Sequence, residues 1–437
     1  WIGLHGIRTT GIAWDPEVVS RRIISWLSHS PVVLQEAEGA FYRRFIGSLS
    51  NQVRYLQRRV DHLPEGLPRL KARIALAMAS VSTEAKASAV RRTGRQLDRE
   101  LERQILPDGT HVSRNPQACV DLLFDLLPLR QTYINLGHDL PQRLISVIDR
   151  IYPAVRFFRH SGGDLALFNG ASSTFATDLM SVLRYDETAG QPFKALPHGG
   201  YHRLSGGDTV LLVDTGKPNS MRLSTTAHAG CLSFELSSGR NRFIINSGLP
   251  RFAGEKLRQL ARTTAAHSTV SVGDVSSARV MQSDYLGPIF TAGPTNVDVD
   301  RQSGPDGSDR LSARHDGYLK RFGILHEREI RINQAGNKIA GRDRLLQSSG
   351  QPLLELPTAQ AIARFHVHPS INLEQVDPKK VRLSAPDGES WDFSIPVGEL
   401  TIEEDVFFAD VSGIRPSHQI EIWFAGPEIR WFLAHHS

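Results

Sequence analysis

The apolar spacing of the sequence changes once along the chain, from a helical period to a strand-like one. Between residues 16 and 158, apolar side chains recur every three or four positions, the spacing that places them on one face of a helix. After residue 190, short apolar runs alternate with Gly, Asn, Asp and Ser turns. Helices followed by strands favour two packed regions over a βαβ chain.

Apolar stripes in the first region predict its helices. Prolines at positions 16, 68, 116 and 141 fall near the expected helix starts, where a missing backbone N–H costs least. The connections between the stripes are short, so consecutive helices are expected to be antiparallel neighbours. The stripes span residues 18–27, 45–60, 74–78, 89–105, 120–129, 144–155 and 173–184.

Strand-sized runs fill the second region and predict an antiparallel β-sandwich, because many short strands follow one another with turn residues between them. The boundary is expected near residues 185–195, which gives a helical domain over 1–190 and a sandwich over 191–437. The predicted class is therefore α+β with more than one domain. The runs span residues 209–213, 231–236, 242–245, 268–272, 325–332, 363–368 and 419–424.

The composition excludes several classes of protein. With 40% hydrophobic and 22% charged residues, the chain is not an intrinsically disordered segment. Two cysteines, Cys119 and Cys231, are too few for a disulfide framework or a cysteine-based zinc site. No apolar run approaches the roughly 18 residues of a membrane span. The first residue is Trp1, so we expect a processed chain, a trimmed one or a fragment.

Arginine dominates the positive charge of the chain. Nine of the 51 basic residues are lysine, the rest are arginine, and the formal net charge is +5. Guanidinium groups suit carboxylate, sulfate and phosphate, so an anionic ligand is one explanation and an arginine-rich genome is the other. The sequence lacks a Gly-rich nucleotide loop, a Gly-x-Ser-x-Gly elbow and a His-Glu-x-x-His motif. These absences disfavour kinases, dehydrogenases, α/β-hydrolases and zincins.

Two polar loops of the helical region carry candidate site residues. The first contains His111, Arg114 and Asn115, and can present donors to an anion. Alternatively, Asn115 caps the helix that starts at the next residue. The second loop contains Arg159 and His160 and leads to Asn169. A cation near a helix C-terminus is also explained by the helix dipole alone.

Histidines near the starts of neighbouring strands form a second group of candidates. His228 and His267 could converge on a metal with Asn246 between them in sequence, or they could be hydrogen-bonded core residues. His366 and His368 alternate along a predicted strand, so both imidazoles are expected on one side of it. Those two side chains could likewise bind a metal or fill a strand face.

Three runs in the second region resemble the heparinase II/III-like polysaccharide lyases, and most closely an alphaproteobacterial branch of that family. They are residues 228–236, 245–248 and 266–270, and the run Trp14-Asp15-Pro16 with Arg21-Arg22 and residues 52–59 is also similar. The resemblance implies an incomplete (α/α) toroid followed by an antiparallel β-sandwich. It also implies β-elimination on a uronic acid polysaccharide, a structural zinc in the sandwich, and a bacterial periplasm or cell envelope as the setting.

The sequence departs from the family at the positions that carry the reaction. A Tyr or His normally removes the C5 proton, and a Tyr or His protonates the leaving oxygen. The family's Asn-His pair falls at Leu67-Pro68, its catalytic Tyr near Ala118, and its catalytic His at Thr226. The metal-binding Asp falls at Asn246, while His228 and His267 are kept. An amide is a poorer zinc ligand than a carboxylate, so we expect a weak or absent zinc site.

Three functions stay open at this point. The first is a carbon–oxygen lyase with a rearranged catalytic set, the second a non-catalytic glycan-binding protein on a lyase scaffold, and the third a glycoside hydrolase. An acidic polysaccharide is the expected partner, with no nucleic acid, no membrane span and an oligomeric state that the sequence leaves open. The groove is expected where the toroid loops meet the sandwich. In the lyase hypothesis, the base is His111 or His160, the acid is Tyr201, and the substrate is bound by Arg114, Asn115, Arg159, Asn169 and Arg262.

Overall fold

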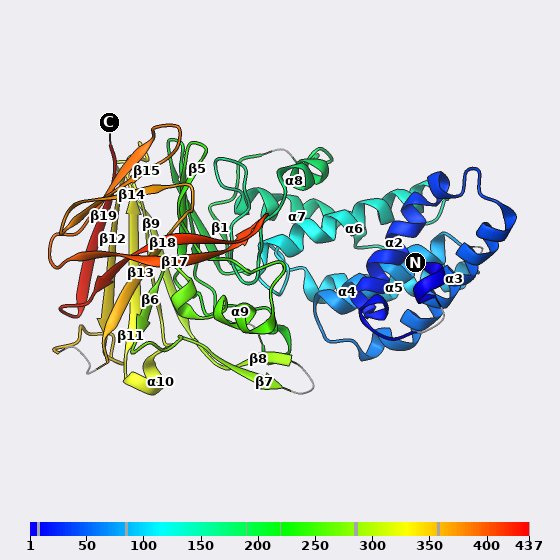
Figure 1. The fold of residues 1–437 in the computed structure, drawn as a ribbon, viewed down its shortest axis with the longest axis horizontal. Helices are drawn as coiled ribbons and strands as arrows, with labels where there is room; N and C mark the ends of the chain where they lie inside the picture. Colours follow the sequence, from blue (N-terminus) through cyan, green and yellow to red (C-terminus); the bar gives the residue numbers. More distant parts are fainter. Residues whose placement is uncertain are drawn as a thin grey trace. The chain divides into compact units, whose positions relative to one another are not determined.

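Contacts between residues divide the chain into two units (Figure 1). The helical unit comprises Trp1–Val112, Ala118–Tyr152 and Val182–Ala189, and the sandwich unit comprises Ser113–Gln117, Pro153–Ser181 and Gly190–Ser437. This computed structural model describes residues 1–6, 9–83, 86–188, 190–218, 220–283, 287–355 and 359–436. The predicted division at residue 190 differs from the contact division in residues 113–117 and 153–181, and the domain assignment stays a prediction.

Helices occupy the first part of the chain, in agreement with the predicted stripes. Asp15 caps α2 by accepting a hydrogen bond from the Glu17 N–H at 2.9 Å. α4 packs against α2, α3 and α5, and its side chains from Leu70 to Val81 are nearly all buried. No helix in the described part of the chain combines the length and apolarity needed to cross a bilayer. The helices are α1 (Ile2–His5), α2 (Pro16–Val33), α3 (Gly39–Arg59), α4 (Leu67–Val81), α5 (Ala87–Gln104), α6 (Pro116–Asn135), α7 (Leu144–Phe158) and α8 (Ala176–Leu183), with short 3₁₀ turns η1 (Ile12–Trp14) and η2 (Val60–His62).

The sandwich unit is built from antiparallel strands with a few short helices between them. The strands are β1 (Ala195–Leu196), β2 (Tyr201–Gly206), β3 (Thr209–Asp214), β4 (Phe234–Ser238), β5 (Asn241–Ile245), β6 (Val270–Val272), β7 (Arg279–Ser283), β8 (Gly287–Ala292), β9 (Val297–Ser303), β10 (Asp309–His315), β11 (Leu325–Ile332), β12 (Lys338–Leu346), β13 (Ala361–Val367), β14 (Asn372–Asp377), β15 (Lys380–Ser384), β16 (Ser390–Ser394), β17 (Leu400–Asp410), β18 (Gly413–Trp423) and β19 (Glu428–His436). The short helices are η3 (Met221–Leu223), α9 (Glu255–Leu260), η4 (Thr264–Ala266) and α10 (Leu319–Phe322).

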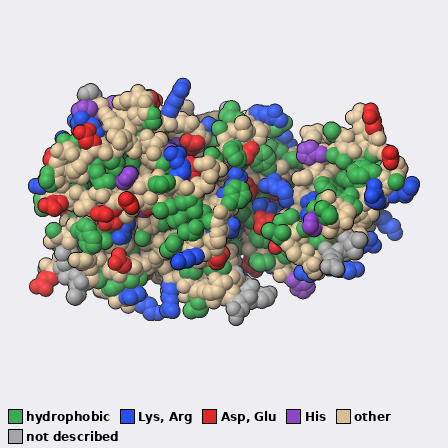
Figure 2. Space-filling view, viewed as in Figure 1, with side chains coloured by type: hydrophobic (Ala, Val, Ile, Leu, Met, Phe, Trp, Pro, Cys, Tyr) green, Lys and Arg blue, Asp and Glu red, His purple; other side chains and the backbone are tan. Residues whose placement is uncertain are grey.

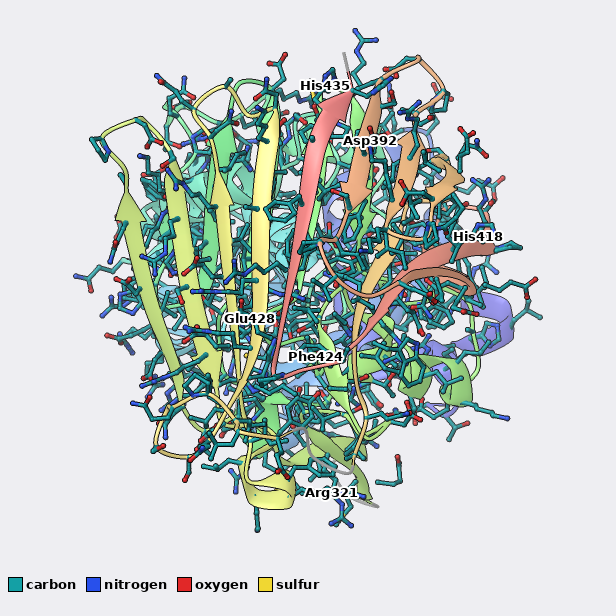
Figure 3. All side chains as sticks on the ribbon, turned by 90° about the vertical axis from the view of Figure 1, so that its left-hand side faces the viewer. Arg321, Asp392, His418, Phe424, Glu428 and His435 are labelled. Atoms are coloured by element: carbon teal, nitrogen blue, oxygen red, sulfur yellow. The ribbon has the colours of Figure 1, made fainter. Side chains whose placement is uncertain are left out.

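Two large sheets form the sandwich. One has the order β1-β2-β3-β4-β5-β13-β18-β17, with β6 also paired to β13, and the other has the order β14-β15-β16-β19-β12-β11-β10-β9. β7 and β8 form a separate two-stranded sheet. Figure 3 looks onto the second large sheet, where Glu428 and His435 mark the two ends of β19. Helices followed by antiparallel sheets confirm the predicted α+β class.

The core of the sandwich lies between the two sheets. Phe234 of β4 and Trp431 of β19 stack with their ring centroids 5.3 Å apart and their planes nearly parallel. Gly341 of β12 is paired with Trp431, and a Cβ at this glycine would overlap the indole ring. The absence of a side chain at Gly341 therefore lets the indole lie flat against β12.

A buried charged group joins the sheets at the centre of this core. Asp343 of β12 accepts hydrogen bonds from Arg328 Nε at 2.7 Å, His326 Nε2 at 2.8 Å and Trp431 Nε1 at 2.9 Å. Arg328 also donates to the carbonyl oxygens of Leu232 and Ser268. Burial opposes the charge of Asp343, and Arg328 more than offsets it, so the pKa of this carboxyl is held well below its usual range. Both carboxylate oxygens of Asp343 therefore accept hydrogen bonds, as a buried ion pair requires.

Candidate functional site

A cluster of polar side chains is buried where β2 begins and β3 ends. Tyr201 and Asp214 are paired across these strands. The Tyr201 hydroxyl donates to the Arg114 carbonyl oxygen at 2.6 Å and accepts from Asn169 Nδ2 at 2.7 Å. Asn169 also donates to Asp214 at 3.0 Å. The hydroxyl of Tyr201 is therefore occupied on both its donor and acceptor sides by the protein itself.

Arg114 completes this cluster by an ion pair with Asp214. Its guanidinium also donates to the Gly199 carbonyl oxygen at 2.8 Å and lies 4.9 Å from the centre of the Tyr201 ring. Burial alone would lower the pKa of Arg114, and the Asp214 carboxylate more than offsets it, so the pKa is raised. A Cβ at Gly216 would overlap the guanidinium, so the close approach of Arg114 requires glycine there.

Two histidines continue the cluster towards β6. The Asn169 side-chain oxygen accepts the His228 backbone N–H, and His228 Nδ1 lies 3.1 Å from His267 Nε2. His267 Nδ1 lies 2.7 Å from the Thr263 carbonyl oxygen. A carbonyl only accepts, so Nδ1 of His267 carries its proton and His228 Nδ1 donates to the other ring. Burial lowers the pKa of His267 to about 4 and holds the pKa of His228 well below its usual range, so both rings are neutral at pH 7.

Glu235 of β4 is the centre of a second buried group. Its carboxylate accepts hydrogen bonds from His160 Nε2 at 2.8 Å, Arg242 Nη2 at 2.9 Å and the Leu167 backbone N–H at 3.0 Å. Asn246 adds its backbone N–H at 3.2 Å and its side-chain N–H at 3.3 Å. Burial opposes the charge, yet Arg242 and the His160 hydrogen bond bring the pKa of Glu235 from 4.5 down to about 2.

The structure brings together many, but not all, of the residues predicted from the sequence. Tyr201, Arg114, Asn169, His228 and His267 share one chain of contacts. His160 and Asn246 meet at Glu235. The catalytic and binding roles assigned to them stay predictions.

The other predicted residues have partners elsewhere. His111 belongs to the helical unit, where it is fully buried with Nε2 3.0 Å from the Gln104 side-chain oxygen. Burial first, and the Lys71 charge second, lower the pKa of His111 to about 3. Asn115 caps α6 through the Gln117 N–H at 2.8 Å. Arg159 donates to its own loop at Gly163, and Arg262 donates to the carbonyl oxygens of residues 227, 224 and 288.

The placement of His228, Asn246 and His267 tests the zinc site that the resemblance implies. The Asn246 side-chain oxygen accepts the Ser268 N–H at 3.1 Å, and its amide nitrogen donates to Glu235. Only the two imidazoles lie together, and neither brings a negative charge. Over the ranges that the structure describes, no three His, Cys, Asp or Glu side chains are grouped so that they could hold a metal ion. These residues do not fit a zinc site.

Asp214 and Glu235 are the carboxylates at the centres of these two groups, and neither is among the candidates predicted from the sequence. Asp214 directly follows the apolar run 209–213, and Glu235 lies within the run 231–236. Both are strand residues in the structure, Asp214 in β3 and Glu235 in β4. A carboxylate in such a position must be paired if it is buried. A charged residue within an apolar strand is therefore the signal that could have identified both.

A cavity of about 570 Å³ opens beside the Arg114 cluster, within the sandwich unit. Arg114, His198, His202 and Lys217 line it, together with backbone of the 199–200 and 215–216 segments. Burial first, and the Arg301 charge second, lower the pKa of His202 to about 4, so this ring is neutral at pH 7. Lys217 is exposed. The cavity therefore offers the cationic side chains of Arg114 and Lys217 and the neutral imidazole of His202 to a ligand.

Residues 188–431 match the family model described as heparinase II/III-like, C-terminal. The chain belongs to the heparinase II/III-like family. FtsZ-localized protein C of Caulobacter vibrioides (strain NA1000 / CB15N) is 29% identical over 449 residues, which cover 99% of this chain and 76% of that protein. This relative fits the alphaproteobacterial branch expected from the sequence.

Solved structures of lyases share the fold of this heparinase II/III-like chain. A crystal structure of heparinase III has a TM-score of 0.75 at 15% identity and covers 100% of this chain and 71% of its own. Heparan sulfate lyase HepC from Pedobacter heparinus has a TM-score of 0.68 at 17% identity, with coverage of 97% and 68%. The predicted class, a helical toroid followed by an antiparallel β-sandwich, is confirmed.

Proposed function

We propose that this protein binds an acidic, uronate-containing polysaccharide and does not cleave it by β-elimination through the predicted acid–base residues. One observation carries the second half of the proposal. His111, His160 and Tyr201 are 0%, 3% and 0% exposed. A general acid or base must reach the substrate proton directly or through one water. Tyr201 and His160 instead direct their protonable atoms at protein partners.

The cavity of about 570 Å³ supports the first half of the proposal. Lys217 is exposed there and has no acidic partner among the residues with a described position. An exposed ammonium at a concave surface attracts carboxylates. Arg114 adds a buried charge to the wall, and its ion pair with Asp214 keeps it in one orientation. We infer that the polysaccharide's carboxylate lies near Lys217.

Isothermal titration with a panel of acidic polysaccharides, heparan sulfate included, tests binding. The same samples are followed for the ultraviolet absorbance of an unsaturated uronate. Lys217→Glu is expected to weaken binding by about tenfold. Lys338→Glu, a matched change on an exposed strand position of the sandwich unit, is expected to leave binding unchanged. Equal loss in both variants, or no binding to any polysaccharide, would contradict the proposal.

Elimination by other residues is a second candidate, and membership of the heparinase II/III-like family favours it. New ultraviolet absorbance from the wild-type chain would establish it. If that absorbance survived in Tyr201→Phe and His160→Gln, the reacting groups would be others than those predicted here. New reducing ends without absorbance would instead indicate a glycoside hydrolase.

Association with FtsZ is a third candidate, supported by the extent of one similarity. The identity with FtsZ-localized protein C covers 99% of this chain, so it includes the helices that precede the family model's residues 188–431. We propose that this chain, like that relative by its name, is found with FtsZ in the cell. Fluorescence microscopy of a tagged chain beside tagged FtsZ tests this, and a uniform distribution would refute it.

A further inference from the structure

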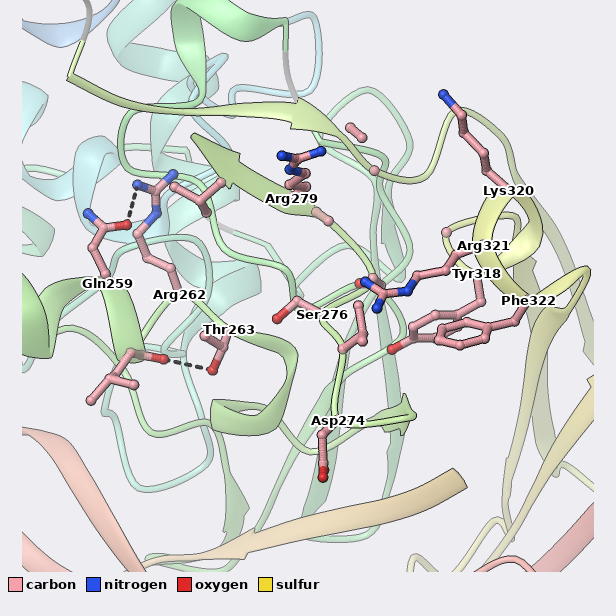
Figure 4. Close-up of a pocket in the computed structure, with 18 of the residues that line it drawn as sticks. Gln259, Arg262, Thr263, Asp274, Ser276, Arg279, Tyr318, Lys320, Arg321 and Phe322 are labelled. Carbon is pink, nitrogen blue, oxygen red and sulfur yellow. Dashed lines mark hydrogen bonds between the residues drawn. The ribbon is translucent and has the colours of Figure 1, made fainter. Parts of the chain in front are cut away.

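A second and larger cavity, of about 880 Å³, lies within the sandwich unit, and Arg262 and Thr263 form part of its lining. Its walls come from α9, from the segment that leads into β7, and from α10 (Figure 4). Leu260, Val280 and Phe322 supply apolar surface, and Leu260 is 48% exposed. An apolar hollow of this size on a monomer surface is typical of a binding site.

Unpaired cations surround this cavity. Lys256, Arg279, Lys320 and Arg321 line it, all four are exposed, and none has an acidic partner within the described part of the chain. Figure 4 shows Arg279 from β7 with Lys320 and Arg321 from α10 around the cavity. In Figure 2, Lys and Arg side chains gather at the edge of the sandwich unit where Figure 1 places α10. Among the described residues that line the cavity, Asp274 is the one with an acidic side chain.

A strand edge borders the same cavity. β7 pairs with β8 alone within the described residues, whereas the far side of β8 is engaged by a hydrogen bond from the Phe290 N–H to Ser224. Residues 278–280, where β7 begins, line the cavity. An open strand edge exposes backbone N–H and C=O groups that can pair with another extended chain.

We propose that this cavity is the docking site of an extended, acidic peptide segment that carries aliphatic side chains. Such a ligand uses all the features together: its backbone pairs with β7, its carboxylates face Arg279, Lys320 and Arg321, and its aliphatic side chains fill the surface of Leu260 and Val280. A free phosphate would use the cations and leave the strand edge and the apolar surface unused. The proposal is independent of polysaccharide binding at the Arg114 cavity.

Fluorescence anisotropy tests the site with a fluorescein-labelled peptide of about ten residues in which Glu and Val alternate. The wild-type chain is expected to bind it saturably. Arg279→Glu/Arg321→Glu is expected to weaken binding by about tenfold or more, because two charge-assisted contacts become repulsive. The matched double variant Arg44→Glu/Arg58→Glu, on the exposed face of α3, should bind like the wild type. Thermal unfolding monitors the fold, and Lys256→Glu/Lys320→Glu replaces the first variant if that one unfolds.

Four competitors distinguish the peptide from other anions. An N-methylated version of the same peptide, which cannot pair along a strand, and a Glu–Ser version without aliphatic groups should each compete at least about tenfold less well. Inorganic phosphate and heparan sulfate should not compete at matched ionic strength. Equal binding by wild type and the Arg279/Arg321 variant would overturn the proposal. Equal competition by the Glu–Ser peptide, phosphate or heparan sulfate would also overturn it, because charge alone would then account for binding.

Discussion

Glu235→Gln is the substitution whose effect the structure determines most sharply. The change keeps the size of the side chain and removes its charge. The buried guanidinium of Arg242 then loses its carboxylate partner. The carboxylate accepts five hydrogen bonds, whereas the glutamine amide that replaces it also donates. Breaking one partner of a buried ion pair typically costs about 3–5 kcal/mol. We therefore expect the free energy of unfolding at pH 7 to fall by about that amount.

The pH dependence of stability gives a second value for the free energy that the Glu235 carboxylate contributes to folding. The pKa of Glu235 is about 2 in the folded chain, against an ordinary value of 4.5. That difference corresponds to about 3 kcal/mol of folding free energy. Because the folded-state pKa is lowered, the contribution is fully present above the ordinary value and is lost as the pH falls from 4.5 towards 2. The gap between wild type and Glu235→Gln should shrink by about 3 kcal/mol over this range.

Urea unfolding of both chains, monitored by tryptophan fluorescence at several pH values, measures the gap. Glu403→Gln, an exposed position of β17, is the matched control and should change stability by less than about 0.5 kcal/mol. A loss below about 1 kcal/mol for Glu235→Gln at pH 7 would refute the reasoning. A gap that stayed constant on acidification would show that the paired charge does not set the stability of this site.

Three further predictions concern the interior of the sandwich unit. Arg328→Met should lower the free energy of unfolding by about 3–5 kcal/mol because Asp343 loses its buried partner, whereas Arg331→Met at an exposed ion pair should lower it by under about 1 kcal/mol. Urea unfolding measures both losses, and equal losses would contradict the argument. Elemental analysis should find no stoichiometric zinc, and a chelator should leave the melting temperature unchanged; a bound metal that is lost in His228→Ala would count against this. Tyr201→Phe should cost about 1–3 kcal/mol in unfolding free energy, since two buried polar partners lose a hydrogen bond, while polysaccharide affinity per folded molecule stays unchanged; normal stability with lost affinity would show a direct role.

The fold could be predicted from the sequence where local periodicity decides the structure. The run at 325–332 forms β11 with the same bounds, and the stripe at 89–105 forms α5 within two residues of each end. The run at 231–236 became a strand only from Phe234, because Leu232 has a φ of 61° and residues 231–232 lie in a turn. His368 falls just beyond β13, so its ring pairs with Ser370 while His366 pairs with Asp405. Local spacing does not reveal such backbone reversals.

The candidate site could be predicted only as a set of residue types. Polar loops and histidines at strand starts identified Arg114, Asn169 and His228, but their partners are distant in sequence. Arg114 pairs with Asp214 of β3, and His160 pairs with Glu235 of β4. Burial then decides between a reacting group and a structural one, and burial depends on the tertiary packing that joins these segments. A sequence pattern therefore identifies candidates without assigning their roles.

The interleaving of the chain limits how this molecule can be cut or recombined. Residues 113–117 and 153–181 belong to the sandwich unit although segments of the helical unit, 118–152 and 182–189, follow each of them in sequence. They carry Arg114 and His160, the counterparts of two interior carboxylates. A shortened chain that starts at Gly190 would contain every strand of the described residues. It would still bury Asp214 without its cation, and Glu235 without the donors that His160 and Leu167 supply. The strands are therefore not a module that could be transplanted alone. A recombinant protein that keeps them folded must also include residues 113–117 and 153–181, and with them the helices that lie between these two segments.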